Sequence, residues 1–155
     1  MTRSEVLDLL QNIVISMGVP VAVMWGAAEL LMGCRESTND IDCAFIFPEG
    51  GDINALIADL KPARSGEWGD VYSKNVWEFS IVSSEEWNKK SLMWSNSFHE
   101  AYPGIWLPSR ECLYDMRKYL CDTLGREKDH AALESILALP LGFYLHSDTS
   151  SDIES

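Results

Sequence analysis

Asp40 and Asp42 are the residues of this chain whose type and spacing point most directly to chemistry. They open a run of strand-forming residues at 41–47. Side chains two positions apart in a strand point to the same face, so these carboxylates would project together, about 6.5 Å apart along the backbone. Such a pair can flank metal ions that lie about 3.5 to 4 Å apart. The D-x-D spacing is weak evidence alone, because it also arises by chance at a solvated strand entrance.

The segment before the aspartates carries groups that bind phosphate. Gly26 and Ala27 stand where a β-rich run at 19–24 gives way to helical composition at 27–32. Backbone N–H groups at such a junction bind phosphate oxygens, and glycine permits close approach. Arg35 and the Thr38 hydroxyl follow on the same loop, to contact a polyphosphate or to fix the loop. The alternatives are a simple turn at Gly26 and a surface ion pair at Arg35.

This order of residues resembles the nucleotidyltransferase family that shares the fold of DNA polymerase β. The resemblance rests on a glycine with a small neighbour, a short helix, an arginine, hydroxyl residues and D-x-D, all within 19–47. A second stretch at 125–130, which reads GREKDH, is similar to the R-x-K-D segment of many small members. The two stretches occur in the expected order and together span most of the chain.

The resemblance implies roles for individual residues. Asp40 and Asp42 would hold magnesium, and Glu78 would be the third carboxylate, as a metal ligand or as the base on an acceptor hydroxyl. Asp70 is the second choice for that position. Glu78 departs from the family, which usually has aspartate there.

The phosphate-binding residues follow from the same resemblance. Gly26, Ala27, Arg35 and Thr38 would surround the triphosphate, and Lys128 would pair with its phosphates. Ala27 stands where glycine or serine is commoner, so a hydroxyl is missing while the backbone N–H remains. Lys128 and its neighbours also read as an ordinary exposed helix face.

Composition limits the classes of function. The chain has 155 residues, enough for one domain, which we expect over 1–145, with a flexible acidic tail at 146–155. A net charge of −12 opposes binding to long nucleic acid, which depends on Lys and Arg. No apolar run is long enough to span a membrane, and the first residues lack the apolar core of a secretion signal. We therefore expect a soluble cytoplasmic protein, as a monomer or homodimer.

Periodicity predicts an α+β fold, a small mixed sheet with flanking helices. We expect helices over 4–17, 27–32, 53–60, 109–121 and 126–139 and strands over 19–24, 41–47, 70–73 and 76–82. Gly26 should end the first strand in a tight turn. Residues 84–106 read as a long ordered loop with at most one more strand. The six tryptophans of the chain belong mainly to the core, and Trp68, Trp87 and Trp94 are the candidates to stack on a base or an aromatic acceptor.

These observations predict a metal-dependent nucleotidyltransferase. It would transfer NMP, with AMP from ATP as the expected case and Mg²⁺ as the metal, to a hydroxyl of a small molecule or protein. One alternative is a catalytically degenerate binding protein on the same fold, which the departures at Ala27 and Glu78 favour. The other is a toxin–antitoxin component that modifies its partner protein.

Overall fold

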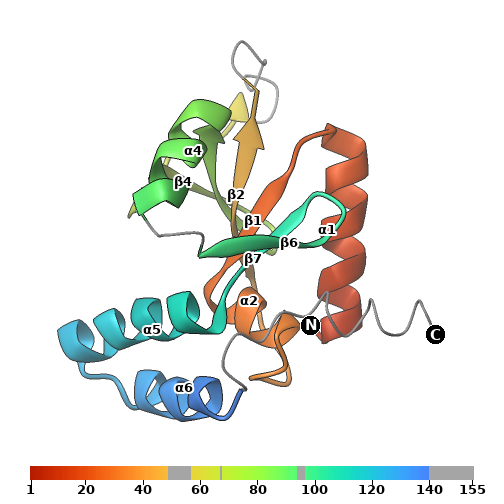
Figure 1. Cartoon of the computed structure of the whole chain (residues 1–155). Coiled ribbons are helices and arrows are strands. Elements are labelled where there is room, and N and C mark those ends of the chain that lie inside the picture. The colour runs from red at the N-terminus through yellow and green to blue at the C-terminus, as the bar shows by residue number, and fades with distance from the viewer. Residues whose placement is uncertain (49–56, 67, 94–96, 140–155) are drawn as a thin grey trace.

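The computed structural model describes residues 1–48, 57–66, 68–93 and 97–139 (Figure 1). The helix expected over 53–60 lies outside these residues except for its end, and the tail expected over 146–155 lies outside them entirely. Within the described part of the chain, no helix is long and apolar enough to cross a membrane.

The fold is α+β, with a seven-stranded mixed sheet and helices around it, as the sequence predicted. The helices are α1 (Arg3–Met17), α2 (Trp25–Leu31), α4 (Ser84–Met93), α5 (Arg110–Leu124) and α6 (Glu127–Leu137). The strands are β1 (Val21–Met24), β2 (Ile41–Phe47), β3 (Arg64–Gly66), β4 (Gly69–Lys74), β5 (Trp77–Ser83), β6 (Phe98–Tyr102) and β7 (Ile105–Pro108). Their order across the sheet is β3-β4-β5-β2-β1-β7-β6, and β2 runs parallel to β5 and β1 parallel to β7.

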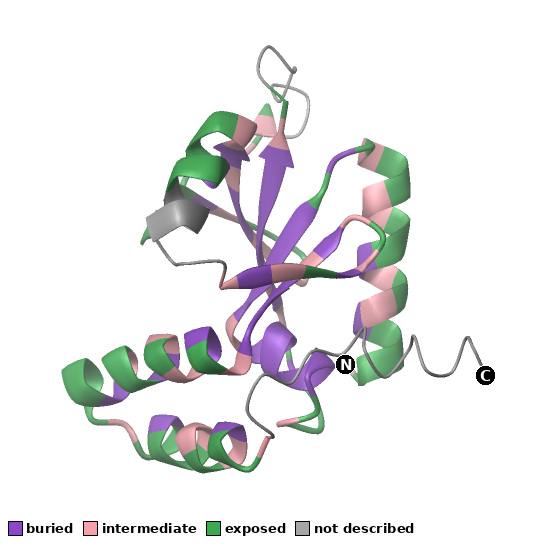
Figure 2. Ribbon diagram, in the orientation of Figure 1, coloured by how far each residue is buried: buried purple, intermediate pink, exposed green. Residues whose placement is uncertain are grey.

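Strand β1 explains how the sheet separates two hydrophobic clusters. All four of its residues are buried, and successive side chains alternate between faces. Val21 and Val23 belong to the cluster that includes Val6 and Leu10 of α1. Ala22 and Met24 belong to the other cluster, to which Trp87 of α4 contributes. Helices α1 and α4 therefore cover opposite faces, while the buried central strands lie between them (Figure 2).

Local capping signals set the ends of α1. The Thr2 hydroxyl accepts from the backbone N–H of Glu5, and the Glu5 carboxylate accepts from the backbone N–H of Thr2. Gly18 ends the helix at φ 68°, a left-handed conformation that glycine adopts without strain. This helix and the strands predicted at 41–47, 70–73 and 76–82 are confirmed, with ends shifted by no more than a residue or so.

The prediction of a long loop at 84–106 is wrong. This stretch holds α4, β6 and the start of β7. The Ser83 hydroxyl accepts from the backbone N–H of Glu86 and so starts α4. The Pro103-Gly104 pair turns β6 into β7, with Gly104 at φ 76°. Both signals are present in the sequence, but the aromatic residues between them obscured the periodicity. Edge strand β3, with only three residues, was not predicted either.

The tight turn expected at Gly26 is also absent. Strand β1 passes directly into α2, which begins at Trp25, so Gly26 lies inside the first helical turn. The residue with positive φ is Trp25, at 53°, and not the glycine beside it.

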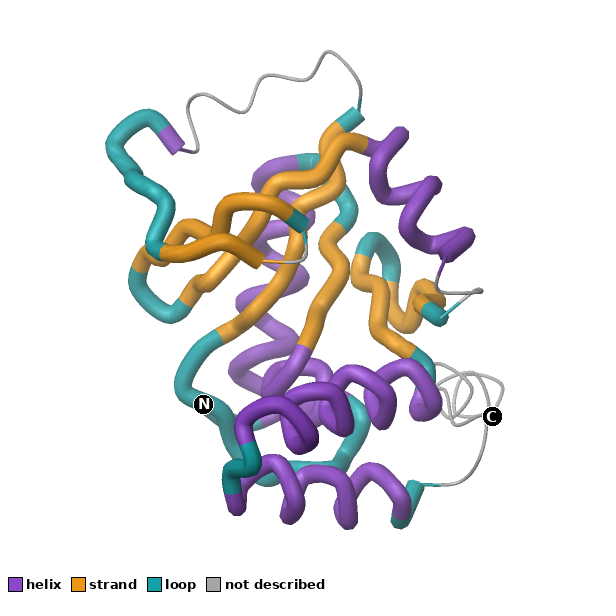
Figure 3. Tube along the Cα trace, turned by 90° about the vertical axis from the view of Figure 1, so that its left-hand side faces the viewer, coloured by secondary structure: helices purple, strands orange, loops and turns teal. Residues whose placement is uncertain are grey.

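A buried ion-pair network attaches α5 and α6 to α2. Helices α5 and α6 lie side by side below the sheet (Figure 3). The guanidinium of Arg117 on α5 donates to Glu29 of α2 at 2.7 and 2.9 Å and to Asp129 of α6 at 2.8 Å. Only 2%, 7% and 0% of Glu29, Arg117 and Asp129 is exposed. Arg126 also donates to Asp129, at 2.8 Å.

The pairing outweighs the cost of burying these charges. Burial lowers the pKa of Arg117, but the neighbouring Glu29 and Asp129 raise it above its ordinary value on balance. The hydrogen bond from Arg126, aided by Arg117, lowers the pKa of Asp129. Arg117 and Asp129 are therefore ionised at neutral pH. Water screens their attraction little, and loss of one partner would leave a buried charge with fewer hydrogen bonds.

Replacing Glu29 tests this network. We expect Glu29→Ala to lower the free energy of unfolding by about 2 to 3 kcal/mol, because the buried Arg117 guanidinium loses two charge-assisted hydrogen bonds and keeps only the one to Asp129. Urea denaturation at pH 7 measures the change. Asp122→Asn is the matched control, since it breaks the exposed Lys118–Asp122 pair and should change stability little. Equal effects of the two substitutions would show that the buried network does not hold the helices in place.

Candidate active site

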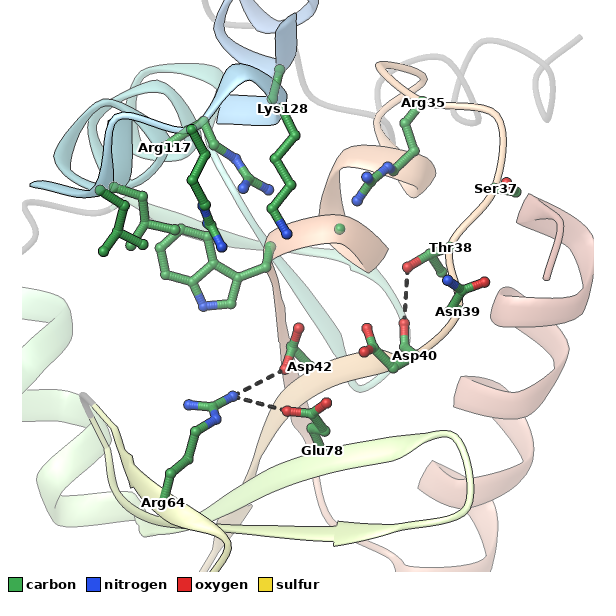
Figure 4. A pocket seen from close by; sticks show the side chains of 16 residues that line it. Arg35, Ser37, Thr38, Asn39, Asp40, Asp42, Arg64, Glu78, Arg117 and Lys128 are labelled. Atoms are coloured by element: carbon green, nitrogen blue, oxygen red, sulfur yellow. Dashed lines mark hydrogen bonds and ion pairs between the residues drawn. The ribbon is translucent and has the colours of Figure 1, made fainter. Parts of the chain in front are cut away.

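One pocket collects most of the residues that the sequence singled out. It has a volume of about 870 Å³ and lies between the end of the sheet, α2 and the α5–α6 pair (Figure 4). Its described lining comprises Trp25, Gly26, Arg35, Ser37, Thr38, Asn39, Asp40, Asp42, Arg64, Glu78, Arg117, Leu120, Leu124, Arg126, Lys128 and Ala132.

Strand register brings the carboxylates together. Asp42 on β2 stands directly opposite Glu78 on the parallel strand β5. Both side chains are on the face that also carries Ala44 and Ile46, because side chains alternate along a strand. Asp40 precedes Asp42 by two positions and turns the same way, and Figure 4 shows the three carboxylates converging. The predicted use of Glu78 in place of Asp70 agrees with this geometry, since Asp70 is exposed on β4, away from the pocket.

Arg64 joins this cluster, which the sequence did not indicate. Its Nη2 lies 3.0 Å from Glu78 Oε1 and 3.6 Å from Asp42 Oδ1. The side chain reaches across from the edge strand β3 and is 52% exposed. Arg64 therefore offsets part of the negative charge between the two carboxylates. Neighbouring sequence gives no signal for this contact, because it depends on how β3 pairs with β4.

The three carboxylates repel one another. Burial, followed by the charges of Asp40 and Glu78, raises the pKa of Asp42 to about 7, although Arg64 and Arg117 oppose the shift. Burial and then Glu78 also raise the pKa of Asp40. The cluster thus has excess negative charge, which a proton or a cation would relieve.

The donor set fits a magnesium ion. Hard carboxylate oxygens are the protein ligands that Mg²⁺ prefers, and it usually takes one or two of them together with water and phosphate oxygens. Among the described residues, no group of three or more His, Cys, Asp or Glu side chains is arranged to hold a metal ion. Asp40 and Asp42 are the two carboxylates that could hold such an ion together with water and phosphate oxygens. The excess charge of the cluster is the feature that favours it.

Cationic side chains form the opposite side of the pocket. Figure 4 shows Arg117 and Lys128 pointing into the space above Asp42, and Arg35 entering from the loop after α2. Arg35 Nη1 lies 3.4 Å from Glu29 Oε1, while the other oxygen of Glu29 accepts from Arg117. One buried carboxylate thus holds two arginines of the pocket. Arg117 was not predicted, because its role depends on contacts with residues distant in sequence.

The loop between α2 and β2 is fixed by its own polar groups. The Thr38 hydroxyl donates to the backbone carbonyl of Asp40 at 3.1 Å. Of the two roles considered for Thr38, the structure shows the one that fixes the loop. A Cβ atom added at Gly26 would collide with Arg35 Nη1 and lie 3.1 Å from Thr38 Oγ1. Glycine is therefore needed for close approach of the Arg35 guanidinium to α2.

Some predicted candidates lie elsewhere. Ala27 is fully buried in the core and does not line the pocket. Trp68 and Trp87 are also buried, at 6% and 7% exposure, so the expectation that they stack on a base or acceptor is wrong, and Trp94 lies outside the described residues. The tryptophan that does line the pocket is Trp25. Nothing in the sequence around Trp25 indicated that its side chain would line a pocket.

The pH dependence of stability tests the carboxylate cluster. Unfolded Asp42 loses its proton near its ordinary pKa of 3.8, whereas the folded carboxyl keeps it up to about pH 7. The ionised carboxylate therefore destabilises the fold progressively between these values and fully above pH 7. We expect Asp42→Asn to raise the free energy of unfolding at pH 8 by on the order of 2 to 4 kcal/mol, and by little at pH 4.

Denaturation series at several pH values measure this effect in the absence of divalent cations. Asp70→Asn is the matched control, because Asp70 is exposed on β4 and lies outside the pocket. A stabilisation by Asp42→Asn that does not grow with pH would refute crowding of the carboxylates.

Comparisons with known proteins bear on the fold of the chain. No protein-family model matches the chain, and no curated protein sequence does. The chain is similar to the crystal structure of ANT(2″)-Ia in complex with adenylyl-2″-tobramycin, with a TM-score of 0.55 and 14% identity over 97% of this chain and 93% of that one. The solution structure of the antibiotic-resistance factor ANT(2″)-Ia gives a TM-score of 0.55 and 14% identity over 99% and 95%. An antigenic nucleotidyltransferase-like protein from Paracoccidioides brasiliensis matches with a TM-score of 0.49 and 14% identity over 97% and 86%. The chain has the nucleotidyltransferase fold.

Proposed function

We propose that this protein transfers a nucleoside monophosphate from a nucleoside triphosphate to a hydroxyl group. The observation that supports this most is the division of one pocket into a carboxylate side and a cationic side. A triphosphate carries negative charge that Arg35 and Lys128 would attract, while Asp40 and Asp42 would hold Mg²⁺. ATP is the proposed co-substrate.

In the proposed transfer, residues of the pocket bind the phosphates and accept the proton of the acceptor. The acceptor oxygen attacks the α-phosphorus, a bond to that phosphorus forms, and the bond to the bridging oxygen breaks with release of pyrophosphate. Glu78 takes the proton of the acceptor hydroxyl. Arg35 and Lys128 hold the leaving phosphates in line with the attack. Magnesium, when bound, lowers the pKa of the acceptor hydroxyl and neutralises charge that develops on the phosphates.

The acceptor in this proposal is a small molecule or a protein with a free hydroxyl. The similar ANT(2″)-Ia was solved with adenylyl-2″-tobramycin, a small adenylylated molecule. The pocket, with a volume of about 870 Å³, leaves room for an acceptor beside the triphosphate. The short α2, of seven residues, has a small dipole, so the arginines and Lys128 supply most of the attraction for phosphate.

A second candidate is a binding protein on the same fold that has lost the chemistry. The position of Arg64 favours it, because a guanidinium between Asp42 and Glu78 opposes a cation there. Release of pyrophosphate from ATP in the presence of hydroxyl acceptors separates the two candidates. Binding of the triphosphate without any pyrophosphate release would support the binding protein.

Binding of a non-hydrolysable ATP analogue tests the proposal directly. Calorimetry with and without Mg²⁺ should show binding that depends on magnesium, and Asp40→Asn combined with Asp42→Asn should abolish that dependence. Because Asp42→Asn relieves charge repulsion, unfolding of the variant is not the expected cause of lost binding. Absence of binding by wild type to any nucleoside triphosphate would refute both nucleotide-based candidates.

Gly26 provides a second test through its contact with Arg35. We expect Gly26→Ala to weaken binding of inorganic tripolyphosphate about tenfold, because the new methyl group displaces the Arg35 guanidinium. The melting temperature should change little, since the atoms that must move belong to the end of a flexible side chain.

The control for this test is a double-mutant cycle with Arg35→Gln. Once the guanidinium is gone, Gly26→Ala should add little further loss of affinity. Additive losses from the two substitutions would show that Gly26 acts independently of Arg35.

A further inference from the structure

Trp25 has an unusual backbone conformation at the edge of the candidate site. Its φ of 53° is in the left-handed region, which bulky side chains rarely adopt. Among the described residues other than glycine, only Asn75 also has positive φ, and it lies in the β4–β5 turn, where asparagine is tolerated. Trp25 has no such local reason, because it begins a helix. The conformation places its indole at the pocket.

Contacts on α5 hold the indole in place. The guanidinium carbon of Arg117 lies 5.5 Å from the centre of the Trp25 ring, a cation–π distance. Arg117 is itself fixed by Glu29 and Asp129. Trp25 is half-buried, so part of the indole is covered by the protein and part faces the pocket. The ring is a preorganised surface that does not need to be ordered when a ligand binds.

Apolar side chains extend this surface along the two helices. Leu120 and Leu124 of α5 and Ala132 of α6 line the same pocket. Leu124 is 53% exposed, one of few large apolar side chains left open to solvent in the described chain. Lys128 and Arg126 stand on the same wall. The wall thus offers an aromatic face and apolar contacts next to cations.

We propose that Trp25, with Leu120 and Leu124, binds the nucleobase of the triphosphate. This inference rests on the proposed function and adds where the base lies. A nucleotide joins a flat aromatic ring to phosphates, which matches an aromatic and apolar wall that adjoins Lys128 and Arg126. The acceptor, by contrast, must bring a hydroxyl to Glu78 on the carboxylate side. Every base presents a ring face for stacking, and purines present the larger one. The site would therefore prefer purines, with few hydrogen bonds to the edges of the base.

The test compares an ATP analogue with inorganic tripolyphosphate, both with Mg²⁺, by calorimetry. Tripolyphosphate carries the phosphates without a base, so the difference between the two affinities reports the base contacts. We expect Trp25→Gly to weaken binding of the ATP analogue roughly tenfold or more and to leave tripolyphosphate affinity within about twofold. Trp25→Phe, which keeps an aromatic face, should retain most of the ATP-analogue affinity.

Glycine suits this position, because it adopts positive φ without strain and so limits the damage to folding. Circular dichroism and thermal melting check the variants, and Trp25→Leu, which keeps apolar bulk without an aromatic face, makes the same comparison if the glycine variant does not fold. Unchanged ATP-analogue affinity in Trp25→Gly or Trp25→Leu would overturn the inference. So would equal losses for both ligands, which would assign Trp25 to the phosphate site. Failure of wild type to bind either ligand would instead refute the proposed function and the inference with it.

Discussion

The buried contact of Glu29 with Arg117 is the interaction on which the geometry of the pocket depends. The carboxylates lie on and beside the sheet, while most of the cations belong to α5 and α6, and these helices join the rest of the described fold through this network and through the buried Leu113 and Ile136. Glu29 also forms an ion pair with Arg35, so one buried carboxylate positions a cation on α5 and a cation on the loop after α2. A charge pair of this kind needs good geometry to offset desolvation, so it favours one arrangement of the helices over near alternatives.

Features that depend on the pattern within a single strand or turn could be predicted from the sequence. The alternation in β2 placed Asp40 and Asp42 on one face, and the polar Lys74-Asn75 turn placed Glu78 on a returning strand. Glu78 itself was proposed from the family resemblance, and the register that places it opposite Asp42 is set by the pairing of β2 with β5. The strand predictions succeed because period-two patterns and turn residues carry their information locally.

Residues whose roles depend on distant contacts could not be predicted in this way. Arg64 reaches the carboxylates because β3 pairs with β4, and a strand of three exposed residues leaves no periodic signal. Arg117 reads as one charge among several on an amphipathic helix until α2 is placed beside it. The stretch at 84–106 shows the opposite case. The capping Ser83 before it and the Pro103-Gly104 turn within it are local signals of helix and strand ends, but the many aromatic residues between them hid the periodicity.

Two unfavourable features meet at this pocket, and their coincidence is informative. Three carboxylates converge with one guanidinium between two of them, and Trp25 holds a backbone conformation that costs about 1 to 2 kcal/mol. A neutral side chain at 42 would relieve the repulsion and a glycine at 25 would relieve the backbone strain, although the Trp25 side chain also packs against the cluster that includes Met24 and Trp87. Folded proteins retain such costs where binding or catalysis requires them, since selection for stability alone removes them. The charge repulsion favours a cation beside the carboxylates, and the indole presents an aromatic face at the pocket. In the proposed function, a nucleoside triphosphate with magnesium would use both.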